Sequence, residues 1–105
     1  MPYINRPRRV VIDRFIDDLL SDINNALYDL GEADLTNGDM NYIVSRLVHS
    51  WALQRPTSYA NLSQANSILA DASQEFYRTV VAPYEDLKAF ENGKVSELDT
   101  RKLGV

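Results

Sequence analysis

Tyrosine and arginine are the residue types in this chain that are best suited to contact a ligand. Tyr42 and Arg46 lie four residues apart, and a later stretch contains Tyr77, Arg78 and Tyr84. Tyrosine rings offer flat faces for nucleotide bases, and arginine guanidinium groups form paired hydrogen bonds with phosphates. Both types are also enriched in protein–protein interfaces, and a tyrosine at the edge of a core has a purely structural role. The candidate ligand-binding residues are Tyr3, Arg9, Asn41, Tyr42, Arg46, Tyr77, Arg78 and Tyr84.

Four polar residues recur at the spacing of one helical face. We call them the polar ridge: Tyr42, Ser45, Arg46 and His49. His49 is the only histidine of the chain, so we expect a partly exposed helical histidine rather than a metal ligand. Arg46 has a structural alternative to ligand binding, namely a salt bridge to an aspartate of the first predicted helix.

The acidic residues do not match the spacing of a catalytic or metal-binding motif. Asp13, Asp17 and Asp18 lie on one predicted helix without an answering glutamate or histidine, which is typical of a solvated face. All-helical nucleotide pyrophosphohydrolases hold magnesium with a Glu-x-x-Glu pair and a Glu-x-x-Asp pair, and neither occurs here. The chain has no cysteine, which excludes a thiolate nucleophile and a zinc–thiolate site. We therefore expect no catalytic residue, no metal and no cofactor, and a pyrophosphohydrolase-like enzyme is only the third alternative.

Length and composition narrow the class of protein. With 105 residues, the chain is expected to form one domain. Its net charge of −4 argues against a protein that binds long nucleic acids. No apolar run approaches the roughly 20 residues that a membrane span needs, and the first residues lack the apolar core of a signal peptide. We expect an intracellular protein without a membrane partner.

The first helix is predicted from about Arg8 to Leu30, with Gly31 as its stop. Its apolar positions recur every three or four residues: Ile12, Phe15, Ile16, Leu19, Leu20, Ile23, Ala26, Leu27 and Leu30. Four arginines lie near its start: Arg6, Arg8, Arg9 and Arg14. Because positive charge is unfavourable at a helix N-terminus, we expect these arginines to pair with carboxylates elsewhere in the chain or with a ligand. The alternative is a solvated basic arm.

The second helix is predicted from about Asp39 to Gln54. A loop over residues 31–38 precedes it and ends in the turn-prone pair Asn37-Gly38. Asp39, or Asn37 before it, is the expected N-cap. The predicted buried positions are Met40, Ile43, Val44, Leu47, Val48 and Trp51.

The third helix is predicted to begin after a cap at Ser58 or Thr57 and to be the longest. Pro83 lacks the backbone N–H that a continuous helix needs, so we expect a kink or break near residues 80–82. The helical pattern resumes over residues 84–90 and ends at Asn92-Gly93. We expect the bend to turn Tyr84 and the Glu85-Asp86 pair away from Tyr77 and Arg78.

Together these patterns predict an all-α fold of three to four antiparallel helices, with the long third helix kinked or broken near Pro83. We expect a single helical domain over residues 1–93 that begins with a short irregular arm (1–8). A flexible C-terminal tail is predicted over residues 94–105. Since two-fold assemblies are the commonest among soluble chains, we also expect a symmetric homo-oligomer.

Several segments carry a resemblance to a known family. They are Met1-Pro2-Tyr3-Ile4, residues 38–47 beginning Gly38-Asp39-Met40-Asn41-Tyr42, Ser58-Tyr59, and residues 75–93 with Ala82-Pro83-Tyr84-Glu85-Asp86. In combination they resemble a family of small, all-helical proteins of unknown function that bacteriophages and bacterial genomes carry. Members of that family often have a second arginine after Tyr-Arg and an acidic residue after Asn-Gly. Here Thr79 and Lys94 stand at those places.

The resemblance implies a phage origin and, as location, the cytoplasm of the infected host cell. Small helical phage proteins include inhibitors of host proteins, structural adaptors, and proteins that sequester the nucleotide signals of immunity. This chain has the aromatic and arginine residues that sequestration needs, and it lacks hydrolytic motifs. We therefore expect a non-enzymatic counter-defence protein that binds and sequesters a small (cyclic) nucleotide as a homo-oligomer. The alternative is an adaptor or inhibitor that binds a host or phage protein.

Overall fold

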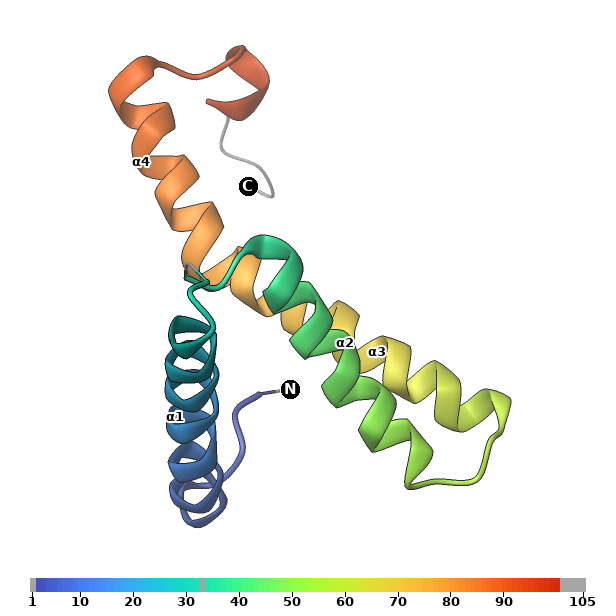
Figure 1. Cartoon of the computed structure of the whole chain (residues 1–105). Coiled ribbons are helices and arrows are strands. Elements are labelled where there is room, and N and C mark those ends of the chain that lie inside the picture. The colour runs from blue at the N-terminus through green and yellow to red at the C-terminus, as the bar shows by residue number, and fades with distance from the viewer. Residues whose placement is uncertain (1, 33, 101–105) are drawn as a thin grey trace. The chain divides into compact units, whose positions relative to one another are not determined.

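The computed structural model describes residues 2–32 and 34–100, and all regular structure within them is helical (Figure 1). The chain divides into two compact units, Met1–Ser67 and Ile68–Val105. The elements are α1 (Arg6–Asp29), α2 (Asn37–Leu53), α3 (Tyr59–Phe76), the π-helical turn η1 (Tyr77–Val81), α4 (Ala82–Asn92) and the 3₁₀ turn η2 (Glu97–Asp99). The predicted all-α class is confirmed. No helix in the described ranges is both long enough and apolar enough to cross a bilayer.

Helix α1 begins two residues earlier than predicted, because Asn5 caps it. The side-chain oxygen of Asn5 accepts a hydrogen bond from the Arg8 N–H at 3.2 Å, which satisfies one of the unpaired donors of the first turn. The helix ends where the glycine predicts. Gly31 has a φ of +79°, a left-handed conformation that glycine adopts without strain and that commonly follows a helix C-terminus.

Helix α2 begins two residues before its predicted start, and its N-cap is neither of the two residues predicted. Thr36 is the N-cap: its hydroxyl accepts from the Asp39 N–H at 3.1 Å, and the Asp39 carboxylate accepts from the Thr36 N–H at 2.9 Å. This reciprocal pair is a capping box. Because the box starts the helix at Asn37, the Asn37-Gly38 pair lies in the first helical turn rather than in a loop. Ala33, within the predicted loop, lies outside the described residues.

A short connection, residues 54–58, joins α2 to α3, and side chains fix both of its ends. Ser58 caps α3 as predicted, since its hydroxyl accepts from the Asn61 N–H at 3.1 Å. The Asn61 amide donates back to the Pro56 carbonyl at 2.7 Å. At the other end, the Arg55 guanidinium lies 3.6 Å from the centre of the Trp51 ring and donates to the Trp51 carbonyl at 2.6 Å.

The expected bend in the long third helix is present, and a π-helical turn makes it. The turn η1 begins at Tyr77, ahead of the predicted residues 80–82, and the Ala82 N–H donates to the Tyr77 carbonyl five residues back. Pro83 then occupies the first turn of α4, where its missing N–H costs little. The wider turn therefore absorbs the proline without breaking the helical run. Gly93, with a φ of +93°, follows the end of α4 as predicted.

The apolar positions predicted to be buried are mostly exposed in the single chain. Among the described residues only Ala65 is buried, at 6% exposure. On α2, the predicted core positions Met40, Val44 and Leu47 are 38%, 43% and 51% exposed, while Ile43, Val48 and Trp51 are half-buried. The prediction of a buried stripe on α2 is therefore wrong for the single chain, since three of its six positions are exposed and the other three are only half-buried. Their apolar spacing is retained, but the described part of one chain does not cover it.

The segment predicted as a flexible tail contains a short ordered turn. Ser96 caps η2, and the Asp99 carboxylate accepts from the N–H groups of Val95 and Ser96 at 3.0 and 3.1 Å. These hydrogen bonds hold the pKa of Asp99 below its usual value. The Ser-x-x-Asp signal of a capping box was present in the sequence. Residues 101–105 of the predicted tail, and Met1 of the predicted arm, lie outside the described residues.

Candidate functional site

The polar ridge lines a hollow on one face of α2. The hollow has a volume of about 240 Å³, and its lining residues are Tyr42, Ser45, Arg46, His49 and Leu53. The sequence places four of these five on the ridge, since positions three and four apart lie on one helical face. Leu53 adds an apolar side chain one turn after His49, and the same spacing would have identified it. The hollow therefore combines an aromatic ring, a cation, a hydroxyl and an apolar side chain.

Hydrogen bonding and charge leave the ridge open to a ligand. The Ser45 hydroxyl donates to the Asn41 side-chain oxygen at 3.5 Å, one turn earlier on α2. Neither of the two ion pairs in the described part of the chain includes Arg46, so the salt bridge considered as its alternative role does not form there. Tyr42 is 67% exposed. A planar cation and an exposed aromatic ring thus lie one helical turn apart on the same face.

A second group of predicted residues lies around η1 and the start of α4. The Glu85 carboxylate accepts a hydrogen bond from the Tyr77 hydroxyl, and this bond, with the negative charge of Glu85 and Asp86, raises the pKa of Tyr77. The prediction that the bend separates Tyr77 from Glu85 is therefore wrong. A π turn takes up one more residue than an α turn, so residues eight apart, rather than seven, share a face.

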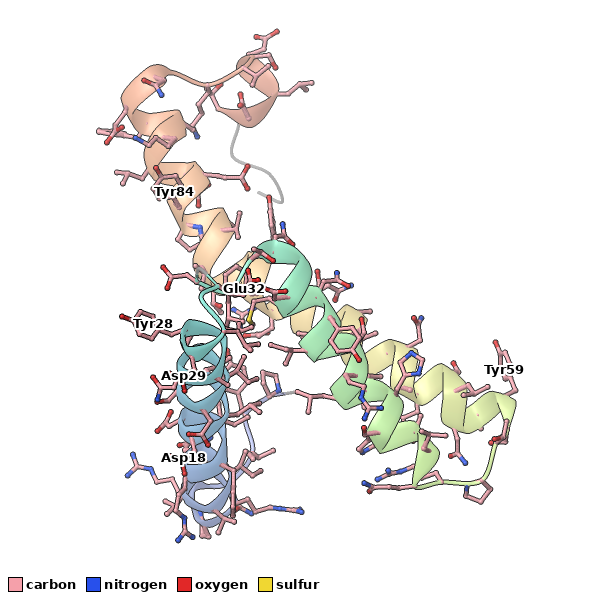
Figure 2. The ribbon with its side chains drawn as sticks, in the orientation of Figure 1. Asp18, Tyr28, Asp29, Glu32, Tyr59 and Tyr84 are labelled. Atoms are coloured by element: carbon pink, nitrogen blue, oxygen red, sulfur yellow. The ribbon has the colours of Figure 1, made fainter. Side chains whose placement is uncertain are left out.

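The two other predicted residues of this unit have partners of their own. The guanidinium of Arg78 pairs with the Glu75 carboxylate at 2.5 Å, which offsets part of the charge that a phosphate would need. The ring of Tyr84, labelled on α4 in Figure 2, has the Lys88 ammonium 5.6 Å from its centre. Lys88 also lies 3.2 Å from Glu91. Lys88 was not predicted, although its position four residues after Tyr84 is the signal for such a pair.

The structure thus brings together some of the predicted residues but not all of them. Asn41, Tyr42 and Arg46 share one helix, and Tyr77, Arg78 and Tyr84 lie in the other unit. Arg9 is on α1, and Tyr3, which is 54% exposed, precedes it. In the first group, Tyr42 and Arg46 line one hollow, and Arg46 has no ion pair among the described residues.

Carboxylates gather at one further hollow, between the end of α1 and the start of α2. Its volume is about 370 Å³, and Glu32, Asp34 and Asp39 contribute acidic side chains to its lining. The Asp39 carboxylate already accepts the Thr36 N–H. Across the described ranges no group of three or more histidine, cysteine, aspartate or glutamate side chains is arranged to hold a metal ion.

Comparison with known proteins identifies a family but no activity. A family model with the description "Domain of unknown function (DUF6899)" matches residues 1–95. Neither the curated proteins nor the solved structures include a match to the chain. The resemblance to an uncharacterised family is thereby confirmed over almost the whole chain, and the family supplies no site residue to compare with the polar ridge.

Proposed function

Because the chain belongs to the DUF6899 family of unknown function, we propose its function from its own residues: it binds and sequesters a small nucleotide as a homo-oligomer. It does so without catalysis. The proposal includes the expectation that the ligand is a cyclic nucleotide signal of bacterial immunity and that the protein acts in the cytoplasm of a phage-infected cell. It rests on the hollow of the polar ridge.

The observation that carries the proposal is the pairing of Tyr42 and Arg46 around one hollow. A tyrosine ring supplies the sequence-tolerant face on which a base stacks. An arginine with no ion pair in the described part of the chain supplies a planar fork that fits phosphate oxygens. The Ser45 hydroxyl and His49 ring add hydrogen-bonding groups for sugar or base. These are the contacts that a nucleotide requires.

Assembly with a second copy is part of the proposal because one helical face is an open site. Ligand sites usually bury most of a ligand's surface, whereas Tyr42 remains 67% exposed in one chain. A second copy that covers the ridge would enclose the ligand and bring a second arginine to its phosphates. Two arginines suit a doubly charged cyclic dinucleotide.

Calorimetric titration with a panel of cyclic dinucleotides and mononucleotides tests the proposal. We expect saturable binding to at least one cyclic dinucleotide by the wild-type protein. Tyr42→Ala should weaken binding roughly 5- to 150-fold, because stacking on an aromatic side chain contributes about 1–3 kcal/mol per base. Tyr42→Phe is the matched control: it keeps the ring face and loses only the hydroxyl, so binding should be retained.

Two results would contradict the proposal. A folded wild-type protein that binds no member of the panel is not a nucleotide-sequestering protein. Equal weakening by Tyr42→Phe and Tyr42→Ala would show that the ring face is not what binds. Conversion of the nucleotide to a product during the titration would instead favour the enzyme alternative, since a sequestering protein releases its ligand unchanged.

A second candidate, a protein-binding adaptor or inhibitor, is favoured by tyrosines away from the ridge. Tyr59, at the start of α3, and Tyr28, at the end of α1, are 89% and 80% exposed (Figure 2). Exposed tyrosine is enriched in protein interfaces. A host protein that the wild type retains and a Tyr59→Ser variant releases, together with no binding to the nucleotide panel, would establish this candidate instead.

A further inference from the structure

Helix α1 has a continuous apolar face that is only partly covered: Leu19, Ile23 and Leu27 are half-buried, and the other large apolar side chains of the face are exposed. We call it the α1 stripe: Ile12, Phe15, Ile16, Leu19, Leu20, Ile23 and Leu27. Phe15 is 66% exposed, and Ile12, Ile16 and Leu20 are between 36% and 46% exposed. A stripe of this width on a helix normally packs against another element.

The charges of α1 are divided between its two ends. Residues 6–17 contain four arginines and two aspartates, a net charge of +2, and residues 18–29 contain three aspartates and no cation, a net charge of −3. Neither ion pair of the described residues involves α1. The arginines at the helix start are unfavourable for the helix dipole, and the aspartates at its end are unfavourable as well. Both sets of charges therefore lack an ion-pair partner among the described residues, although the Arg14 guanidinium lies 5.8 Å from the centre of the Phe15 ring.

We propose that the α1 stripe is the surface on which a second copy of this chain docks, with the two α1 helices antiparallel. Antiparallel pairing places the positive first half of each helix beside the negative second half of its partner. It also opposes the two helix dipoles. A parallel pair would align like charges along the whole length. A two-fold axis across the middle of α1 satisfies both copies equally.

The size of the stripe fits a dimer contact. Full burial removes about 90 Å² of apolar surface for a typical large side chain. With the four exposed residues counted in full and the three half-buried ones at about half, the two copies together bury about 1,000 Å², the smallest area expected of a specific protein interface. The helix, at 24 residues, is about 36 Å long, which is enough for all seven to contribute.

Spin-label distances in the full chain test both the contact and its direction. The chain has no cysteine, so Ser21→Cys and Tyr28→Cys, both off the stripe, each give one label per copy. For an antiparallel pair centred on α1, the rise of 1.5 Å per residue predicts separations along the axis of about 10 Å for position 21 and about 30 Å for position 28. Equal separations at the two positions would overturn the antiparallel arrangement. A monomeric wild type would overturn the contact itself.

Substitution of Phe15 tests whether the stripe forms the contact. Because the substitution occurs in both copies, Phe15→Asp should weaken self-association at least about a hundredfold in sedimentation experiments while the helix content by circular dichroism is retained. Loss of helix content instead of dissociation would show that the stripe packs within its own chain, which contradicts the proposal. Asn24→Asp, off the stripe on the same helix, is the control that keeps self-association and adds the same charge.

Charge-swapped variants test the same contact without touching an apolar side chain. One variant carries Arg8→Asp and Arg9→Asp, and the other carries Asp22→Arg and Asp29→Arg. Each swap suits the helix dipole better than the wild type does, so weaker self-association cannot be attributed to a weaker helix. We expect each variant alone to associate less than the wild type and an equal mixture to form a heterodimer. Unchanged association of either variant alone would refute the charge pairing.

This inference rests on the proposed function only for the premise that copies assemble. A dimer with the predicted label distances that binds no nucleotide would refute the proposed function and leave the inference standing. An oligomer that binds a nucleotide but gives equal label distances would refute the inference alone.

Discussion

The contact between Trp51 and Arg55 gives the most quantitative prediction about the fold. The guanidinium lies 3.6 Å from the ring centre and donates to the Trp51 carbonyl at 2.6 Å. Both residues are half-buried, so solvent screens the interaction only in part. A cation–π contact of this kind contributes about 0.5–2 kcal/mol, and a charged hydrogen bond to one of the last helix carbonyls adds to it.

We expect Arg55→Ala to lower the free energy of unfolding by about 1–2 kcal/mol. For a chain of this size, that corresponds to a fall in Tm of about 5–10 °C. Arg55→Lys is the matched control: it keeps the charge but loses the planar stack on the ring. Its free energy of unfolding should therefore lie between those of the wild type and Arg55→Ala.

Thermal unfolding followed by circular dichroism measures this effect, and all variants must be compared at one protein concentration because assembly shifts Tm. An Arg55→Ala variant that unfolds at the wild-type temperature would refute the reasoning. An Arg55→Lys variant that is as destabilised as the alanine variant would contradict the part assigned to the charge, because the retained ammonium would then contribute nothing.

Three further predictions follow from the site and the helix termini. Arg46→Ala should weaken nucleotide binding roughly 10- to 150-fold, because a charged hydrogen bond contributes about 1.5–3 kcal/mol. Arg46→Lys should weaken it less, and both variants should unfold at the wild-type temperature. Equal nucleotide affinities of the wild type and the alanine variant would exclude Arg46 from the site. Tyr77→Phe should lower stability at neutral pH, where the hydroxyl donates to Glu85. The pKa of Tyr77 is raised above 10.0 in the folded chain, so this stabilisation is present below about pH 10 and is lost as the pH rises through the raised pKa. The stabilities of the wild type and the variant in urea denaturation should therefore converge at high pH. A difference in stability that persists there would contradict the hydrogen bond. Thr36→Ala should cost about 1 kcal/mol in urea denaturation and Thr36→Ser almost nothing, and equal stability of all three would contradict the capping box.

The helices could be predicted from the sequence because their apolar residues recur at helical spacing over long stretches. Gly31 marks the end of α1, and the cap at Ser58 marks the start of α3. The start of α2 was missed because Asn37-Gly38 has the composition of a turn, while the Thr36–Asp39 pair is a stronger signal for a helix start. Local capping chemistry prevailed over turn propensity there.

The bend near Pro83 could be predicted, but its form could not. A proline shows that the hydrogen-bond pattern must change before it, and the sequence does not show whether the helix breaks or widens. The π turn decided the orientation of the following residues. It brought Glu85 close enough to the Tyr77 hydroxyl to raise the pKa of Tyr77, whereas ordinary helical spacing places Tyr84 rather than Glu85 most directly in line with Tyr77.

The polar ridge could be predicted because all of its residues lie on one helix, where spacing alone fixes the face. Tyr77, Arg78 and Tyr84 were harder, because their surroundings depend on neighbours such as Glu75 and Lys88 and on the π turn. The exposure of the α1 stripe could not be predicted either, since spacing shows that a face is apolar and not what covers it.

Equilibrium dialysis against a cyclic dinucleotide, followed by denaturation of the protein, tests the central claim most directly. If the protein sequesters the nucleotide, the ligand is drawn into the protein compartment in proportion to the protein present. After denaturation it is then recovered in full and chemically unchanged. Failure to draw in any cyclic dinucleotide of the panel, or recovery of a hydrolysed product, would contradict the account.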